Sequence, residues 1–159
     1  MPEITFEQYA GPYLDHPDFK AECREAATTL LYVVNEVLSI AAEDGVKFDE
    51  NPQTKSLVSR SGNGGFRPQD CKIGAAKSKH KTGHGVDVRD PVPARTFTRW
   101  CYTHSDELKK RGLCVENVRW TLGWVHLQDV PPGPLGSKWR IDFIPSPEPP
   151  QCKPLPEQV

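Results

Sequence analysis

The stretch SKHKTGHGVD, residues 78–87, contains the residues around which this chain is expected to fold. His80 and Asp87 are separated by an odd offset, which on one straight strand would place their side chains on opposite faces. The chain must therefore turn between them if both are to reach one site. Gly83 lies between them and tolerates the positive φ that such a turn can require.

Two short strands are expected to carry the chemistry. In the first, residues 85–88, two valines share one face and Asp87 points to the other. In the second, WVHLQ at residues 124–128, apolar residues again alternate with polar or aromatic ones. His126, Trp124 and Gln128 therefore share a face, and that face is where a site is predicted.

Two imidazoles and one carboxylate form a ligand set for a metal ion. His80, Asp87 and His126 would bind Zn²⁺ at about 2.0–2.2 Å and leave a fourth tetrahedral position for water, the layout of hydrolytic zinc centres. A water bound there would have its pKa lowered towards about 7. The sequence therefore predicts Zn²⁺ as cofactor.

This pattern resembles that of the zinc D-alanyl-D-alanine carboxypeptidases and L-alanyl-D-glutamate endopeptidases, which cut peptidoglycan stem peptides. Their motif is Ser, any residue, His, six residues and Asp, followed by a distal His in a short strand, here Ser78, His80, Asp87 and His126. The upstream segment SRSGNGGFRP, residues 59–68, is similar to the serine-and-arginine turn of the family. The resemblance covers roughly residues 33–143 and implies the hedgehog/DD-peptidase fold.

The resemblance also implies residues that contact the substrate. It places Arg67 against a substrate carboxylate, which a guanidinium can bind through two parallel hydrogen bonds. From the strand alternation alone, Trp124 would form a wall of the site or be a buried strand aromatic, and Gln128, on the same face, would contact the substrate or satisfy a backbone group. Ser78 belongs to the motif, and His84 is expected near the metal or the substrate without being a ligand.

The general base departs from the family pattern. Members usually carry an acid a few residues before the distal His, but residues 121–125 contain none. Glu116 is the nearest upstream candidate, because a neighbouring antiparallel strand could bring it to the metal. Asp129 and Asp90 remain alternatives, and zinc hydrolases need such a group to accept and return a proton.

Composition fits one compact domain. The chain has 159 residues, of which 36% are hydrophobic, and a net charge of −1, so no overall attraction to nucleic acid or membranes is implied. Residues 60–89 include seven lysines and arginines but two aspartates, a local net charge of +5. Such a positive charge would attract ligands rich in carboxylates. The expected partner is a peptidoglycan stem peptide.

Cysteine usage and the N-terminus indicate a protein kept in the cytoplasm of the producing cell. The five cysteines are odd in number and form no CxxC pair, which favours a reducing compartment. Residues 1–19 contain acidic residues and no apolar core of a signal peptide, and no run of 18 apolar residues follows. A wall substrate would then be reached from a virion or after release.

The expected fold class is α+β, a small mainly antiparallel sheet with a long N-terminal helix and a second helix. Apolar residues at three- and four-residue steps predict the first helix from about Pro17 to Glu43, and the second is expected from about Ala94 to Lys110. Strands are expected near residues 57–59, 85–88, 113–116, 124–128 and 139–143. Residues 1–144 would form the zinc domain, and residues 145–159, rich in proline, an extended tail that could contact phage structural proteins.

Three functions fit these residues. The first is a zinc peptidase of peptidoglycan, a phage endolysin or bacterial wall-lytic enzyme, although the bond that it cuts is left open between carboxypeptidase and endopeptidase. The second is a weakly active or inactive member of the fold that serves as a structural or binding component of a phage particle. The third is a non-haem Fe(II) oxygenase with two histidines and one carboxylate, whose usual jelly-roll needs more strands than this chain offers.

Overall fold

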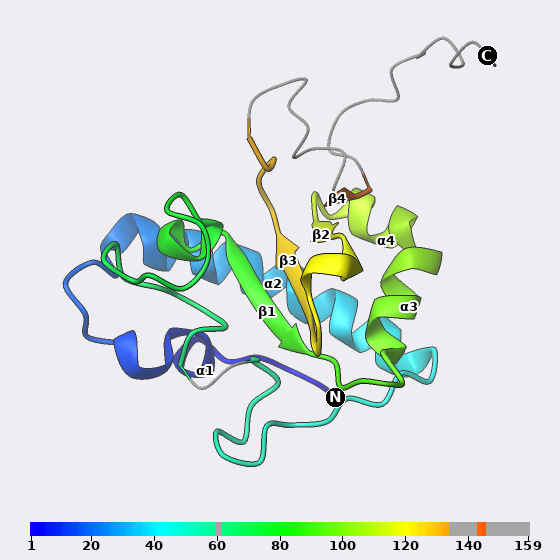
Figure 1. Cartoon of the computed structure of the whole chain (residues 1–159). Coiled ribbons are helices and arrows are strands. Elements are labelled where there is room, and N and C mark those ends of the chain that lie inside the picture. Colours follow the sequence, from blue (N-terminus) through cyan, green and yellow to red (C-terminus); the bar gives the residue numbers. More distant parts are fainter. Residues whose placement is uncertain (60–61, 134–142, 146–159) are drawn as a thin grey trace, which may run out of the picture.

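The computed structural model describes residues 1–59, 62–133 and 143–145, which form an α+β domain (Figure 1). A four-stranded antiparallel sheet packs against a long N-terminal helix, as the sequence predicted. The helical elements in chain order are α1 (Phe6–Ala10), η1 (Gly11–Tyr13), α2 (Ala21–Glu43), η2 (Lys79–Thr82), α3 (Thr96–Thr103), α4 (Ser105–Lys110) and η3 (Val118–Trp120). The strands are β1 (Gly85–Arg89), β2 (Cys114–Glu116), β3 (Trp124–Gln128) and β4 (Phe143–Ile144).

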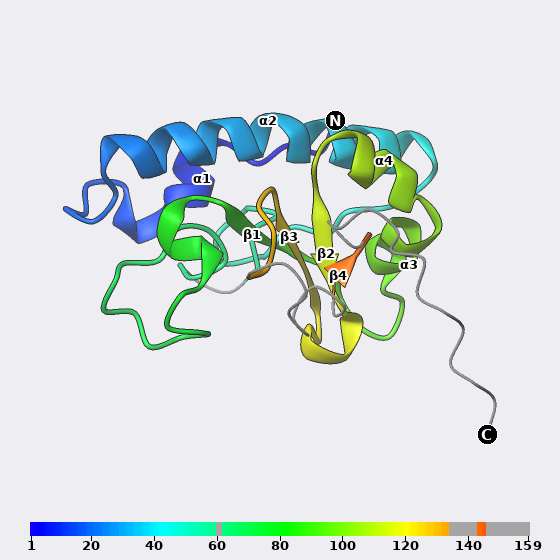
Figure 2. The ribbon, with the colours of Figure 1, turned by 90° about the horizontal axis from the view of Figure 1, so that it is seen from above.

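Helix α2 forms one layer of the domain and runs along the sheet (Figure 2). Its buried residues recur at three- and four-residue steps and belong to the hydrophobic core: Ala27, Leu30, Leu31, Val34, Val37, Leu38 and Ala41. The helix ends as predicted at Glu43, and the backbone N–H of the following residue, Asp44, donates to the carbonyl of Ile40. It begins at Ala21 and not near Pro17, because Lys20 is extended.

The same helix is long and apolar enough to cross a membrane, by length and composition alone. In this structure seven of its apolar side chains are instead part of the core of the described domain, and Cys23, Val33 and Ile40 pack against that core. A core helix passes the same test of length and hydropathy, so α2 is accounted for by its packing.

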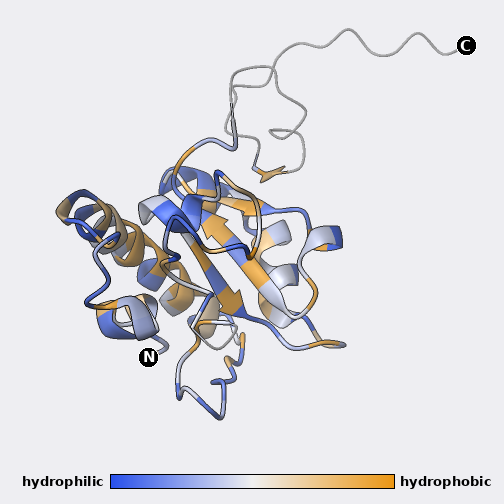
Figure 3. Ribbon diagram, turned by 60° about the vertical axis from the view of Figure 1, so that its left-hand side comes forward, coloured by the Kyte–Doolittle hydropathy of each residue, from blue (hydrophilic) through white to orange (hydrophobic). Residues whose placement is uncertain are grey.

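The strands follow the order β1-β3-β2-β4, and every neighbouring pair is antiparallel. β3 spans the predicted residues 124–128, and its pairing with β1 sets Asp87 opposite His126. The apolar face of β1, β2 and β3 is buried, with Val86, Val88, Val125, Leu127 and Val115 in the core. Apolar residues accordingly lie along the central strands in Figure 3. The opposite face carries the polar residues of the same strands, since alternate residues point to opposite sides.

Two predicted elements take another form. Helix α3 ends at Thr103 and α4 begins at Ser105, so the single helix expected over residues 94–110 is wrong. His104 leaves the helical conformation with φ −119° and ψ 36°, and its ring stacks on Trp100 at a centroid distance of 4.5 Å. Residues 57–59 pair with β1 only through a bridge between Val58 and Val88.

The structure describes only part of the C-terminal strand and tail that the sequence predicted. Of the strand expected over residues 139–143, only Phe143 is described, and it begins β4. Residues 146–159 of the expected tail lie outside the described part of the chain. β4 completes the sheet by pairing with β2, where Glu116 lies opposite Phe143.

Candidate metal centre

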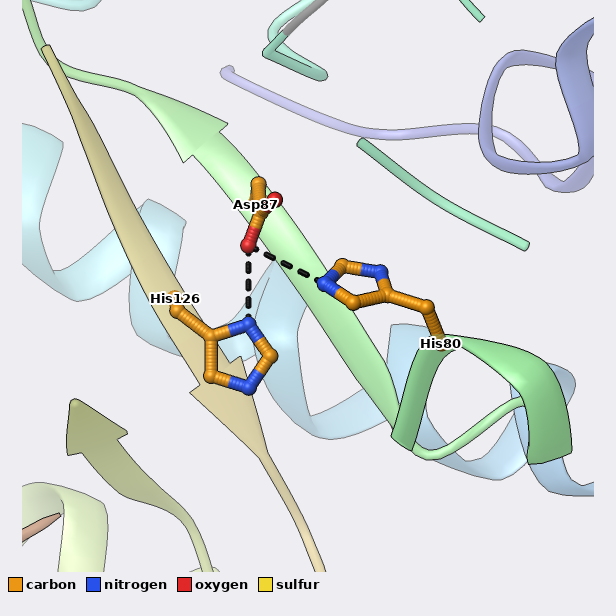
Figure 4. Close-up of side chains that lie close together, drawn as sticks. All are labelled: His80, Asp87 and His126. Atoms are coloured by element: carbon orange, nitrogen blue, oxygen red, sulfur yellow. Dashed lines mark hydrogen bonds and ion pairs between the residues drawn. The ribbon is translucent and has the colours of Figure 1, made fainter. Parts of the chain in front are cut away.

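Three elements bring His80, Asp87 and His126 together. His80 is in η2, Asp87 in β1 and His126 in β3, and their side chains point towards one another (Figure 4). The turn that the sequence required is η2, which ends at Gly83 with φ 81°. A side chain at Gly83 would also meet the carbonyl of Cys23, since a Cβ there would lie 2.3 Å from its oxygen.

Ser78 begins this turn. Its hydroxyl accepts a hydrogen bond from the backbone N–H of His80 over 3.4 Å, and the residue precedes η2 as its N-cap. Such a cap satisfies a backbone donor that the helical turn leaves without a partner. In the structure the serine of the motif therefore caps the turn that contains His80.

Both imidazoles approach the same carboxylate oxygen. Oδ1 of Asp87 lies 2.8 Å from Nδ1 of His126 and 3.2 Å from Nε2 of His80. The three side chains are buried, with exposed fractions of 2% for His80 and Asp87 and 7% for His126. Their ligand atoms all lie within 4.8 Å of one another. A tetrahedral ion about 2.0–2.2 Å from each ligand would set them about 3.3–3.6 Å apart, so small side-chain shifts make the set fit a metal.

The outer nitrogens of the two rings are occupied by acceptors. Nδ1 of His80 lies 2.7 Å from the carbonyl oxygen of Gly65, which can only accept, so this nitrogen carries the proton. Nε2 of His126 lies 2.9 Å from Oε1 of Gln128. The amide nitrogen of Gln128 donates to the carbonyl of Val130, so Oε1 is the atom that faces His126 and can only accept. Nε2 of His126 is therefore protonated as well. In the neutral rings, the inner nitrogens then present lone pairs to one point, as metal ligation requires.

Burial and neighbouring charges set the protonation of the group. Burial lowers the pKa of His80. Burial would raise the pKa of Asp87, but the two histidines stabilise its charge and bring that pKa well below its ordinary value. For His126, burial opposes the charged form, yet the hydrogen bond to Asp87 and its charge raise the pKa. An ionised Asp87 and a neutral His80 are the states in which these groups bind metals.

Glu116 lies on the site face of β2, the strand next to His126. Val115 pairs with Leu127 of β3, so the same register continued by one residue puts Glu116 beside His126. Asp87, His126, Glu116 and Phe143 therefore form one row across all four strands. The negative charge of Glu116 also contributes to the raised pKa of His126. The sheet thus places the predicted base next to a candidate metal ligand.

A pocket of ≈ 530 Å³ opens over this row. Aromatic side chains line it beside the three candidate ligands, and Lys77, Ser78 and Lys79 contribute polar and basic groups. The aromatic lining consists of Trp120, Trp124 and Phe143. The predicted residues Arg67, Glu116 and Gln128 line the same pocket. Of the residues expected at the site from the sequence, eight therefore meet there and His84 does not: His80, Asp87, His126, Glu116, Arg67, Ser78, Trp124 and Gln128.

Arg67 is directed at a residue of the chain itself. Its Nη2 donates to Oδ2 of Asp87 over 2.9 Å, and both side chains are buried. Nε donates to the carbonyl of Asn63 and Nη1 to that of Ile73. The resemblance placed this guanidinium against a substrate carboxylate, whereas in the structure it binds the carboxylate of a candidate ligand.

Other predicted residues lie away from the pocket lining. Nδ1 of His84 lies 2.8 Å from Oδ1 of Asp129, so these two residues pair with each other. Burial raises the pKa of Asp129, which His84 partly offsets. Asp90 is also buried, and its carboxylate accepts hydrogen bonds from the backbone N–H groups of Phe97 and Thr98 at the start of α3. The two alternative bases therefore have structural partners elsewhere.

Two groups at the centre were not found from the sequence. The carbonyl of Gly65 is a backbone atom, and no residue type marks a carbonyl that will accept from His80. Gly65 itself is required, because a Cβ there would lie 1.8 Å from the carbonyl oxygen of Tyr9. Phe143 makes an edge contact with His126 at a centroid distance of 6.3 Å, and its position depends on the pairing of β2 with β4.

Comparisons of the chain with protein-family models, with curated proteins and with solved structures found no match. The resemblance to zinc peptidases of peptidoglycan therefore rests on the motif residues alone. What the structure adds independently is their convergence into a group that could hold a metal ion.

Proposed function

We propose that this protein is a zinc-dependent hydrolase that cleaves peptide bonds in peptidoglycan stem peptides, with the hedgehog/DD-peptidase fold. The convergence of Asp87 Oδ1, His80 Nε2 and His126 Nδ1 on one point carries the proposal. Three lone pairs so close together are stable only around a cation, which can be either a proton or a metal ion. Because the outer ring nitrogens already donate to Gly65 and Gln128, the inner ones are oriented as ligands.

Zinc in this position would supply a water with a pKa lowered towards about 7 and would polarise the carbonyl under attack. Glu116, next to His126, is the residue proposed to accept a proton from the attacking water. As the new C–O bond forms and the C–N bond breaks, Glu116 returns that proton to the departing amine. Positioned acid–base groups of this kind contribute about 10²–10⁴-fold to rate.

The pocket suits a peptide that carries carboxylates. Lys77 and Lys79 line one part of it, and Trp120 and Trp124 line another. Stem peptides offer carboxylates to the lysines and small apolar side chains to the indoles. Since Arg67 already binds Asp87, the lysines are the proposed partners of a substrate carboxylate. Their ammonium groups can attract an anion without fixing its orientation as a guanidinium would.

Digestion of purified sacculi tests the function. The protein purified with bound zinc is incubated with sacculi, and the released fragments are identified by mass spectrometry. Cleavage within or at the end of the stem peptide is expected, and the new ends reveal which bond is cut. The His126→Ala protein is the matched control and should release nothing. Failure of the zinc-loaded wild type to release any stem-peptide fragment would reject the peptidase proposal.

A structural role in a phage particle is the second candidate. The observation that favours it is the absence of any acid in residues 121–125, directly before His126. In that case the protein would bind zinc and intact sacculi without cleaving them. A pull-down with sacculi, combined with the digestion, distinguishes a protein that binds sacculi without cleaving them from an enzyme.

A non-haem iron oxygenase uses the same ligand types. The described residues form one four-stranded sheet, whereas a jelly-roll has about eight strands in two sheets. The geometry therefore favours the hydrolase. Metal analysis of the purified protein distinguishes the two, because the hydrolase is expected to contain zinc and the oxygenase iron.

A further inference from the structure

Arg67 is held from three directions. Nη2 donates to Oδ2 of Asp87 over 2.9 Å, Nε to the carbonyl of Asn63 over 2.6 Å and Nη1 to the carbonyl of Ile73 over 3.3 Å. Only 4% of the residue is exposed. A guanidinium is a planar fork with donors in fixed directions, so two backbone contacts determine where the third donor points. The direction of Nη2 is thus set before any ligand binds.

The two oxygens of Asp87 consequently have separate partners. Oδ2 belongs to Arg67, and Oδ1 faces His80 and His126. A carboxylate free to turn could bind an ion through both oxygens and occupy two coordination positions. We propose that Arg67 is a positioning residue that keeps Asp87 a one-oxygen ligand and thereby reserves a coordination position for water or substrate. This inference rests on the proposed metal centre.

The same side chain also supports the wall of the pocket. Its contact with the carbonyl of Ile73 holds the chain just before Gly74, Ala75, Lys77 and Ser78, which line the pocket. The two parts approach closely at Gly74, where a Cβ would lie 2.7 Å from Nη1 of Arg67. One guanidinium therefore determines both the orientation of a metal ligand and the position of a substrate-facing segment.

Position and charge predict opposite effects of removing Arg67. On charge alone, loss of a cation near a divalent ion would strengthen metal binding, because a repulsion disappears. On position, loss of the fork leaves Oδ2 of Asp87 buried without this partner and lets the carboxylate turn, which weakens or remodels the site. The sign of the change in zinc affinity therefore distinguishes the two explanations.

The test compares Arg67→Met, Arg67→Lys and Lys77→Met with the wild type. Lys77 lines the same pocket, so Lys77→Met removes a nearby positive charge without removing the contact to Asp87. Zinc affinity is measured by competition with a chromophoric chelator, and cobalt(II) substituted for zinc reports the coordination number through its visible absorption. Circular dichroism and thermal unfolding show whether each variant is folded.

We expect Arg67→Met to bind zinc about 10–100-fold more weakly, the usual effect of losing a group that orients a ligand. Its cobalt(II) spectrum should weaken as the coordination number rises. Arg67→Lys should be intermediate, since an ammonium cannot hold Asp87 and both carbonyls together. It serves as the test if Arg67→Met fails to fold. Lys77→Met should retain zinc affinity and the wild-type spectrum.

Unchanged or tighter zinc binding with an unchanged spectrum in a folded Arg67→Lys or Arg67→Met protein would overturn the proposal. This outcome is distinct from failure of the metal centre itself. If the wild type binds neither zinc nor cobalt(II), the proposed function fails, and with it the basis of this inference. If the wild type binds zinc and the Arg67 variants bind it equally well, only the positioning role is lost.

Discussion

The imidazole of His126 donates from Nε2 to Oε1 of Gln128 over 2.9 Å, across two residues of one strand. The orientation of the amide is fixed because its nitrogen donates to the carbonyl of Val130. Gln128 therefore determines which nitrogen of His126 carries a proton and which faces Asp87. The residue lies in the pocket, but its principal partner is a candidate metal ligand.

Replacing Gln128 should weaken metal binding without removing a ligand. Gln128→Leu leaves Nε2–H of His126 buried without this acceptor, and zinc affinity is expected to fall by about 10–100-fold. Gln128→Glu keeps an acceptor at the same position and should retain most of the affinity. Chelator competition measures both. Equal zinc affinity in the Leu and Glu variants would show that the acceptor does not orient His126.

Alanine at each of His80, Asp87 and His126 should abolish stoichiometric zinc. The valines and Leu127 on the other face of the strands remain, so the fold is expected to survive. Metal content is measured by mass spectrometry of the purified proteins. His84→Ala is the matched control, since this imidazole lies near the motif but pairs with Asp129. Full zinc retention in His126→Ala would eliminate the proposed ligand set.

Glu116→Gln tests the proposed proton acceptor. The amide has nearly the same shape but cannot take up the proton, so hydrolysis should slow by about 10²–10⁴-fold while zinc content stays unchanged. The rate is measured on a defined muropeptide, with Asp129→Asn as a variant expected to keep its activity. Near wild-type turnover by Glu116→Gln would assign the proton transfer to another group.

Asp90 is expected to act on stability alone. Its carboxylate accepts hydrogen bonds from the backbone N–H groups of Phe97 and Thr98 and from the hydroxyl of Thr98, the last over 2.5 Å. Asp90→Ala leaves these buried donors without that acceptor and should lower the free energy of unfolding by about 1–3 kcal/mol. Chemical denaturation gives this value. A large loss of activity in a folded, zinc-loaded Asp90→Ala protein would contradict the purely structural role.

The parts of the fold that follow from local alternation were predicted well. β3 has the predicted limits, because the sequence WVHLQ alternates and is flanked by a glycine and an aspartate. The break at His104 was not predicted, because no glycine or proline marks it in the sequence. The structure shows the His104 ring stacked on Trp100 at this point, a contact that the sequence does not mark.

The candidate site likewise has parts that the sequence predicts and parts that it does not. The sequence marks His80, Asp87 and His126 by residue type and spacing, and the structure places them together. It does not mark the partner of Arg67, because a guanidinium suits a substrate carboxylate and the carboxylate of Asp87 equally well. Choosing between them requires the positions of Asn63 and Ile73, whose carbonyls aim the side chain.

The row of residues across the four strands bears on how the sheet finds its alignment during folding. A slip of β3 by one residue would turn His126 into the hydrophobic core, so burial of apolar side chains excludes it. A slip by two residues preserves the apolar face and sets Asp87 opposite Trp124 or Gln128. Among alignments that the core does not distinguish in this way, only the native one assembles all three ligands. An ion captured by the folding chain would therefore add its binding free energy to the correct alignment alone.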